Sequence, residues 1–145
     1  MIGLLQRVAH ADVRVGDDMI ARIDRGILVF VGVERDDDAS HAARLAERLL
    51  TYRVFPDANG KMNLDVLAIG GGVLLVPQFT LAADTGVGTR ASFTSAASPE
   101  TARELYEQLV AAVRRKLPHT QTGRFGADMQ VHLTNDGPVT FSLRT

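Results

Sequence analysis

A decapeptide near the middle of the chain, VPQFTLAADT at residues 76–85, sets polar groups directly after a short apolar run. The run VLLV at 73–76 predicts a buried strand, so Gln78, Phe79 and Thr80 would stand at its carboxyl end, where functional groups often gather. A hydroxyl such as that of Thr80 becomes a nucleophile beside a base, and no sequence neighbour supplies one. Thr80 could equally cap a turn, and the Gln78 amide could simply tie down the loop.

A second stretch, LTNDGPVTFSL at residues 133–143, predicts a hairpin near the C-terminus. Its strands would be Met129–Leu133 and Val139–Leu143, joined by a run of turn-forming residues. Pro138 falls at the start of the returning strand, although it has no N–H for a sheet ladder. The preceding turn formers alone would suffice, so the Gly137-Pro138 pair needs another explanation.

The elements that must position these groups follow from hydrophobic periodicity. Apolar residues at helical spacing predict one helix after the capping oxygens of residues 36–40 and another from Pro99 to about Leu117, with Ser98 as its N-cap. The other predicted strands are Leu4–Val15, Met19–Ile23 and Ile27–Val33, and residues 55–63 predict a loop or hairpin tip. Together they predict one compact α+β domain over residues 1–145, with a strongly curved, barrel-like sheet and two outer helices.

Composition and absent motifs exclude several classes of function. The chain has no cysteine, so thiol catalysis, disulfides and thiolate metal sites are excluded, and its net charge of −1 gives no general attraction to nucleic acid. It has no phosphate-binding loop, no dinucleotide fingerprint, no G-x-S-x-G elbow and no histidines at metal-ligand spacing. The longest apolar stretch is too short to span a membrane, and we expect a cytoplasmic protein without metal.

Two motifs together resemble those of the D-aminoacyl-tRNA deacylases, the chiral proofreading enzymes of translation: PQFTL at 77–81 and NDGPVT at 135–140. Further segments occur in the order found in that family and extend the resemblance over essentially the whole chain: QRV at 6–8, GKMNLDV at 60–66, ADTGVGTRASF at 83–93 and TGRFGADMQV at 122–131. The resemblance implies a homodimer without cofactor that hydrolyses the ester between a D-amino acid and the acceptor end of tRNA. One position departs from the family, which commonly has Ser where this chain has Pro77.

The resemblance also explains the Gly137-Pro138 pair. It implies a cis peptide bond whose two carbonyl oxygens point into the active site of the partner subunit and accept hydrogen bonds from the substrate α-ammonium group. Gly137 adds conformational freedom and has no Cβ to obstruct a ligand. An L side chain would then strike the Gly-Pro backbone, a D side chain would leave the pocket, and glycine would pass.

Roles for the remaining site residues follow from the same resemblance. The N–H groups of Phe79 and Thr80 would stabilise the oxyanion, and Gln78 would order the loop and the terminal ribose. Thr80 is either a covalent nucleophile or a bystander. We favour the second role, with the 2′-hydroxyl of tRNA assisting, because Thr80 has no identifiable base.

Two further residues are candidates for holding the Gly137-Pro138 segment. The Arg7 guanidinium would fix it, although the Arg7 stem could instead cover apolar surface while its head reaches water. Met129 would pack beneath it, or would be an ordinary core residue. Residues 114–116, His119 and Arg124 are the densest basic stretch, which could contact phosphate or merely complement a helix end.

Two rival functions stay open on sequence grounds. The first is a non-catalytic nucleic-acid-binding dimer of the same fold, which would bind tRNA or a single strand without cleaving an ester. The second is a dimer that binds free D-amino acids tightly. The sparse basic surface and the intact site motifs weigh against the nucleic-acid-binding dimer.

Overall fold

The structure is a computed structural model that describes all residues from Met1 to Thr145. Its elements are β1 (Ile2–Val15), β2 (Asp18–Ile23), β3 (Gly26–Gly32), α1 (Ala39–Thr51), β4 (Phe55–Pro56), β5 (Met62–Leu64), β6 (Gly72–Pro77), the 3₁₀ turn η1 (Phe79–Ala82), α2 (Pro99–Arg114), β7 (Gln121–Thr122) and β8 (Gln130–Arg144). β4 and β5 form a small separate hairpin, as the polar segment 55–63 predicted.

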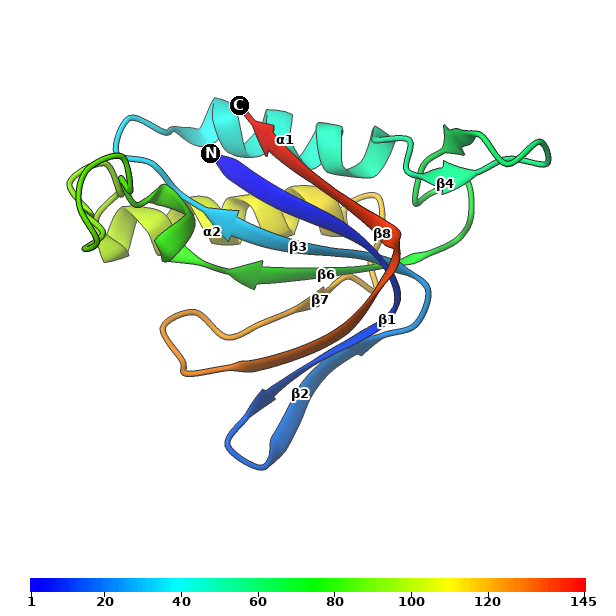
Figure 1. Cartoon of the computed structure of the whole chain (residues 1–145), viewed down its shortest axis with the longest axis horizontal. Helices are drawn as coiled ribbons and strands as arrows, with labels where there is room; N and C mark the ends of the chain where they lie inside the picture. Colours follow the sequence, from blue (N-terminus) through cyan, green and yellow to red (C-terminus); the bar gives the residue numbers. More distant parts are fainter.

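The main sheet is strongly curved because its longest strand changes neighbours along its length. The strand order is β2-β1-β3-β6-β7, with β8 on the other edge of β1. The first half of β1 pairs with β3 and the second half with β2, while β8 runs beside both halves. In Figure 1, β2 and the far ends of β1 and β8 curl away beneath β3 and β6. The sheet is therefore nearly closed, and the predicted barrel-like fold is confirmed.

The two central strands are covered on both faces, as their continuous apolar runs predicted. Alternate residues of β3 enter different clusters: Val29 and Val31 pack toward the helices, and Leu28 packs into the curl of the sheet. β6 alternates in the same way, with Leu75 on the helix side and Leu74 on the other. Figure 1 shows both helices on one side of the sheet. This arrangement leaves the carboxyl ends of β3 and β6 beside α2.

Both helices begin where the sequence predicted. Ser98 accepts a hydrogen bond from the Thr101 N–H at the start of α2. At the start of α1, hydrogen bonds from the Ser40 hydroxyl and from the N–H groups of His41 and Ser40 lower the pKa of Asp38 to about 2. The α2 helix ends at Arg114, before the predicted Leu117. Neither helix is long and apolar enough to cross a lipid bilayer.

The predicted C-terminal hairpin is wrong, because β8 is one continuous strand. Both of its halves pair antiparallel with β1, Asn135 opposite Val8 and Thr140 opposite Gln6. Residues 136–139 between them have no partner in β1 and form a bulge. The Asn135 side chain closes the bulge: its oxygen accepts from the Val139 N–H at 3.1 Å and its nitrogen donates to the Thr140 hydroxyl at 2.9 Å. The turn-forming residues thus make a bulge, and the strand resumes in the same direction.

Candidate active site

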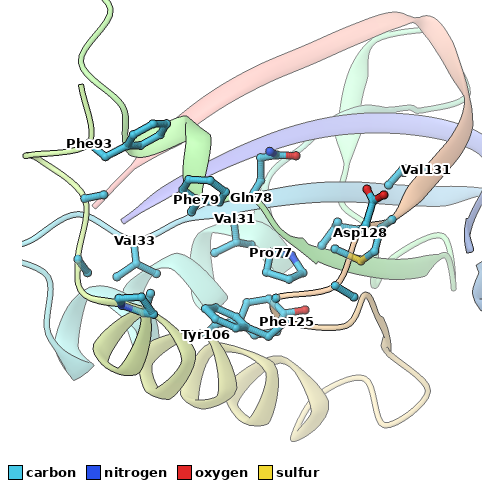
Figure 2. Close-up of a pocket in the computed structure, with 18 residues that line it drawn as sticks. Val31, Val33, Pro77, Gln78, Phe79, Phe93, Tyr106, Phe125, Asp128 and Val131 are labelled. Atoms are coloured by element: carbon cyan, nitrogen blue, oxygen red, sulfur yellow. The ribbon is translucent and has the colours of Figure 1, made fainter. Parts of the chain in front are cut away.

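A cavity of about 680 Å³ opens between the carboxyl ends of β3 and β6 and the first turns of α2 (Figure 2). Apolar side chains of both strands form its floor, α2 forms one wall, and the chain leading into β8 forms another. Its lining consists of Val31, Val33, Val76, Pro77, Gln78, Phe79, Phe93, Ala96, Ala97, Pro99, Ala102, Tyr106, Phe125, Gly126, Ala127, Asp128, Met129 and Val131. The cavity is mostly apolar, with few polar groups at its edge, as is typical of small-molecule sites.

The Gln78-Phe79-Thr80 segment forms the lip of this cavity. The Gln78 N–H donates to the Val31 carbonyl at 2.7 Å, which ties the segment to the end of β3. The first hydrogen bond inside the following turn runs from the Leu81 N–H to the Gln78 carbonyl. The N–H groups of Phe79 and Thr80 precede that bond, so they have no acceptor within the turn. Two backbone donors therefore lie side by side at the lip.

The Thr80 side chain is exposed and is not part of the cavity lining. Its hydroxyl oxygen accepts a hydrogen bond from the Gln78 side-chain nitrogen at 2.6 Å. No acid, histidine or lysine is in hydrogen-bond contact with it, and no cluster of three His, Asp or Glu side chains is placed to hold a metal ion. Gln78 thus binds Thr80, and the structure gives Thr80 no base.

Two aromatic rings from separate segments form one rim. Phe79 is 61% exposed and Phe93 is 44% exposed, and their ring centroids are 5.1 Å apart. The segment that carries Phe93 is fastened by a hydrogen bond from the Ser95 hydroxyl to the Ala82 carbonyl. Figure 2 shows both rings on the side of the cavity opposite Tyr106 and Phe125. An exposed aromatic pair fixed in this way presents a face on which a planar group can stack.

The opposite wall consists of residues that the sequence did not single out. The Tyr106 hydroxyl donates to the Leu75 carbonyl at 2.9 Å, and burial raises the pKa of Tyr106 above its ordinary value, so this hydroxyl stays protonated. The Phe125 ring lies 6.2 Å from that of Tyr106. Tyr106 was hidden among the apolar residues of its helix. Phe93 and Phe125 both occur in the family-like segments at 83–93 and 122–131, which was the signal available for them.

Arg7 connects three parts of the chain near the β8 bulge. Its Nε donates to the Asp136 carbonyl at 2.9 Å and lies 3.2 Å from the Asp136 carboxylate, while its Nη1 donates to the Val54 carbonyl at 2.7 Å. The Arg7 side chain is only 12% exposed. Its donors are therefore used inside the protein, on the residue that precedes Gly137.

Gly137 and Pro138 are exposed at the crest of the bulge and do not line the cavity. The bond between them is cis, and Gly137 has a φ of 133°. A Cβ on Gly137 would lie 2.7 Å from the Val139 Cγ2 and 3.0 Å from the Arg7 Nη2. Only glycine fits this backbone without displacing its neighbours.

The two motifs lie far apart within one chain. Arg7, beside the bulge, pairs with Ile27, whereas Pro77 pairs with Val31, four residues further along β3. That separation is about 13 Å along the sheet, and β8 lies three strand spacings, about 14 Å, from β6. In Figure 1 the bend of β8 and the tip of β6 lie at opposite ends of the sheet. Gly137 of one chain therefore does not reach the cavity of the same chain.

Met129 belongs to the cavity and not to the Gly137 end of its own chain. Its sulfur lies 3.3 Å from the Arg124 nitrogen and faces the backbone of Gly123, on which a Cβ would lie 2.9 Å from that sulfur and 3.2 Å from the Pro77 ring. Pro77 thus packs where β6, Gly123 and Met129 meet. Met129 precedes β8, and about 26 Å of extended strand would separate it from Gly137.

Comparisons with a family model and with individual relatives agree with each other. The family model described as D-Tyr-tRNA(Tyr) deacylase matches residues 4–144. A D-aminoacyl-tRNA deacylase of Klebsiella pneumoniae is 58% identical over 99% of both chains, and one of Stutzerimonas stutzeri is 57% identical over the full length of both.

Two solved structures also match. A structure titled c-Myc DNA Unwinding Element Binding Protein is 35% identical, covers 100% of this chain and 99% of its own, and has a TM-score of 0.95. A probable eukaryotic D-amino acid tRNA deacylase is 16% identical with a TM-score of 0.85, covers 98% of each chain and shows the same fold.

Proposed function

Because this chain belongs to the D-Tyr-tRNA(Tyr) deacylase family, we propose that it hydrolyses the ester bond between a D-amino acid and the terminal adenosine of tRNA. The observation that carries the proposal is the family match over residues 4–144, together with relatives that are 57–58% identical over the whole chain. The cavity beside the Gln78-Phe79-Thr80 segment supports it, since it offers an apolar space next to two free backbone donors.

In the proposed reaction the substrate carbonyl lies at the lip of the cavity. Water adds to the carbonyl carbon, the carbonyl oxygen becomes an oxyanion, and the N–H groups of Phe79 and Thr80 donate to it. The bond between the carbonyl carbon and the ribose oxygen then breaks, and that oxygen takes up a proton to regenerate the ribose hydroxyl. The neighbouring 2′-hydroxyl of the substrate assists, since it is held beside the reacting ester. Gln78 keeps the lip in shape through its bond to Thr80.

Chiral selection is proposed to require a second copy of the chain. The Gly137-Pro138 segment is exposed and lies far from its own cavity, which supports a homodimer in which each bulge enters the cavity of the partner. The carbonyl oxygens of the bulge would accept hydrogen bonds from the substrate α-ammonium group. With ammonium and ester both held, an L side chain meets the Gly-Pro backbone, whereas a D side chain points out and glycine passes. Met129, in the cavity wall, would pack against the partner's bulge.

The Thr80→Ala variant tests the bystander role of Thr80. We expect kcat for D-Tyr-tRNA to fall by no more than about tenfold. The variant loses the hydrogen bond from Gln78, but the Thr80 hydroxyl has no base and the N–H at this position is retained in alanine. Single-turnover deacylation of radiolabelled D-Tyr-tRNA measures this rate. A folded Thr80→Ala protein with no activity would restore the covalent nucleophile.

The function itself is tested by deacylation of D-Tyr-tRNA, L-Tyr-tRNA and Gly-tRNA by the wild-type protein. The proposal predicts rapid release of D-tyrosine and glycine and no release of L-tyrosine above the spontaneous rate. Equal rates on both tyrosyl enantiomers would refute chiral selection, and they would point to Pro77, where the family commonly has Ser, as the origin of the relaxed pocket.

Nucleic-acid binding without catalysis is the second candidate, and one observation favours it. The 35% identical structure, which matches over the whole chain, is titled a DNA unwinding element binding protein. Under this candidate the chain would bind nucleic acid and leave all three esters intact. The same deacylation assay therefore separates the two functions.

A further inference from the structure

A second cavity, of about 430 Å³, adjoins the first along α2. Tyr106 and Phe125 line both cavities, so they form the partition between them. The remaining lining comes from one face of α2, which carries Arg103, Glu107 and Arg114, and from the end of β7 at Thr122 with the residues that follow it, Gly123 and Arg124. We call this second cavity the arginine groove.

The arginine groove is positively charged although the chain as a whole is not. It contains three arginines against one carboxylate, that of Glu107, whereas the chain has a formal net charge of −1. None of the three arginines is in an ion pair, since the salt bridges of the structure involve other residues. Two further carboxylates, Glu100 and Glu104, lie at the outer edge beyond Arg103. Within the lining, arginines therefore outnumber carboxylates by three to one, and no arginine is held in an ion pair.

Two of the three guanidinium groups, those of Arg103 and Arg114, are held in place by neutral partners. The Arg103 guanidinium lies 5.0 Å from the centre of the Phe125 ring. Arg114 donates to the Thr120 carbonyl from Nε and Nη2 at 3.3 and 3.2 Å, which leaves other N–H donors free. These contacts orient the two side chains without cancelling their charge.

The spacing of the arginines fits an extended anion. Arg103 and Arg114 are eleven residues apart on α2, so they share one face of the helix. This separation corresponds to a rise of about 16 Å, far longer than a single phosphate group. Arg124 lies on the opposite side of the groove, in the segment that carries Phe125. A row of cations that ends at an aromatic residue is the pattern of a channel for single-stranded nucleic acid.

We propose that the arginine groove binds the backbone phosphates of the single-stranded 3′ end of tRNA and leads its terminal nucleotide past Phe125 into the first cavity. This assignment rests on the proposed function, because the ester must reach the lip formed by Gln78, Phe79 and Thr80. Phosphate contacts carry no sequence information, so the groove accepts the common 3′ end of all tRNAs.

Direct binding tests the groove independently of catalysis. The probe is an uncharged RNA hairpin with an unpaired 3′ end of CCA, followed by fluorescence anisotropy. The triple variant Arg103→Gln, Arg114→Gln, Arg124→Gln should bind it at least about tenfold more weakly, and the slope of log K against log salt should fall by about 2. A control with three exposed, unpaired cations elsewhere, Arg44→Gln, Arg53→Gln, Lys61→Gln, should bind like the wild type. If the triple variant binds as tightly as the control, the groove does not hold phosphate.

Kinetics give the second readout. The triple variant should have a KM for D-Tyr-tRNA that is about tenfold or more above the wild-type value, with kcat unchanged. A second substrate, 3′-O-(D-tyrosyl)adenosine, has no phosphate, so the kcat/KM of the triple variant for it should stay at the wild-type value. An equal loss on both esters would contradict the proposal. If the triple variant does not fold, Arg124→Gln alone, in an exposed segment, should give a smaller shift of the same kind. A wild-type protein that cleaves neither ester would refute the proposed function, and the hairpin measurement would still decide the groove.

Discussion

The Gly137→Ala variant should lose about a hundredfold in kcat/KM for D-Tyr-tRNA while remaining folded. The added Cβ would lie 2.7 Å from the Val139 Cγ2 and 3.0 Å from the Arg7 Nη2, and the φ of 133° is one that alanine rarely adopts. The bulge must therefore shift, and its carbonyl oxygens move away from the position that the proposed binding of the substrate ammonium requires. Because the bulge is exposed and outside the β1 ladder, the shift leaves the core intact.

The matched control for this variant is Gly16→Ala. Gly16 also has a positive φ, of 58°, but a Cβ there meets nothing within 4 Å, and the residue lies in the turn between β1 and β2. It should lose a comparable amount of stability from backbone strain, about 1 kcal/mol, and no activity. Thermal unfolding of both variants beside their deacylation rates separates the two effects. Equal activity in Gly137→Ala and Gly16→Ala would show that the bulge plays no part in catalysis.

The second large loss of activity is expected for the Arg7→Lys variant. Arg7 donates to the Asp136 carbonyl from Nε and to the Val54 carbonyl from Nη1, two nitrogens held apart by the planar guanidinium. A lysine carries its three N–H donors on one terminal nitrogen, so it does not reproduce both contacts. The carbonyl of the buried residue Val54 then loses its charged donor, which should lower the free energy of unfolding by about 2 kcal/mol. The bulge also loses its anchor, so kcat/KM should fall by about a hundredfold, as in Gly137→Ala.

Urea unfolding and deacylation kinetics measure the two effects of Arg7→Lys. The control is Arg14→Lys on the same strand, where the side chain is 40% exposed and lies 3.7 Å from Asp12, so little change is expected. A folded Arg7→Lys protein with full activity would mean that the Arg7 stem merely covers apolar surface, the alternative that the sequence left open.

Local patterns predicted most elements because each pattern reflects local physics. Ser98 and Pro99 define the start of α2, and the continuous apolar run of β3 reflects burial on both faces. β7 has only two residues and pairs with β6 alone, so no periodicity could reveal it. The β8 bulge was missed for another reason: its turn-forming residues are those of a hairpin, and only the partner strand decides whether the chain reverses or continues.

The residues at the lip of the cavity could be predicted from the sequence, but the residues of the opposite wall could not. Gln78 and Phe79 follow directly from a buried strand, so their place at the edge of a cavity could be foreseen. The opposite wall comes from Tyr106 and Phe125, which are brought there only by packing of α2 against the end of β6. The same packing places Met129 in the cavity and leaves Gly137 outside it. The sequence motifs identified candidate site residues, and the fold determines which of these residues lie close together within one chain.

Subunit mixing most directly tests the proposal that two subunits share each active site. Gly137→Ala protein, whose cavity is intact, is unfolded and refolded together with an Ala127→Trp protein, whose cavity is filled and whose bulge is intact. Each mixed dimer would then contain one complete site, so random pairing should restore about a quarter of the wild-type rate on D-Tyr-tRNA from two inactive proteins. A mixture as inactive as its components would show that cavity and bulge do not act across subunits, and would contradict the mechanism.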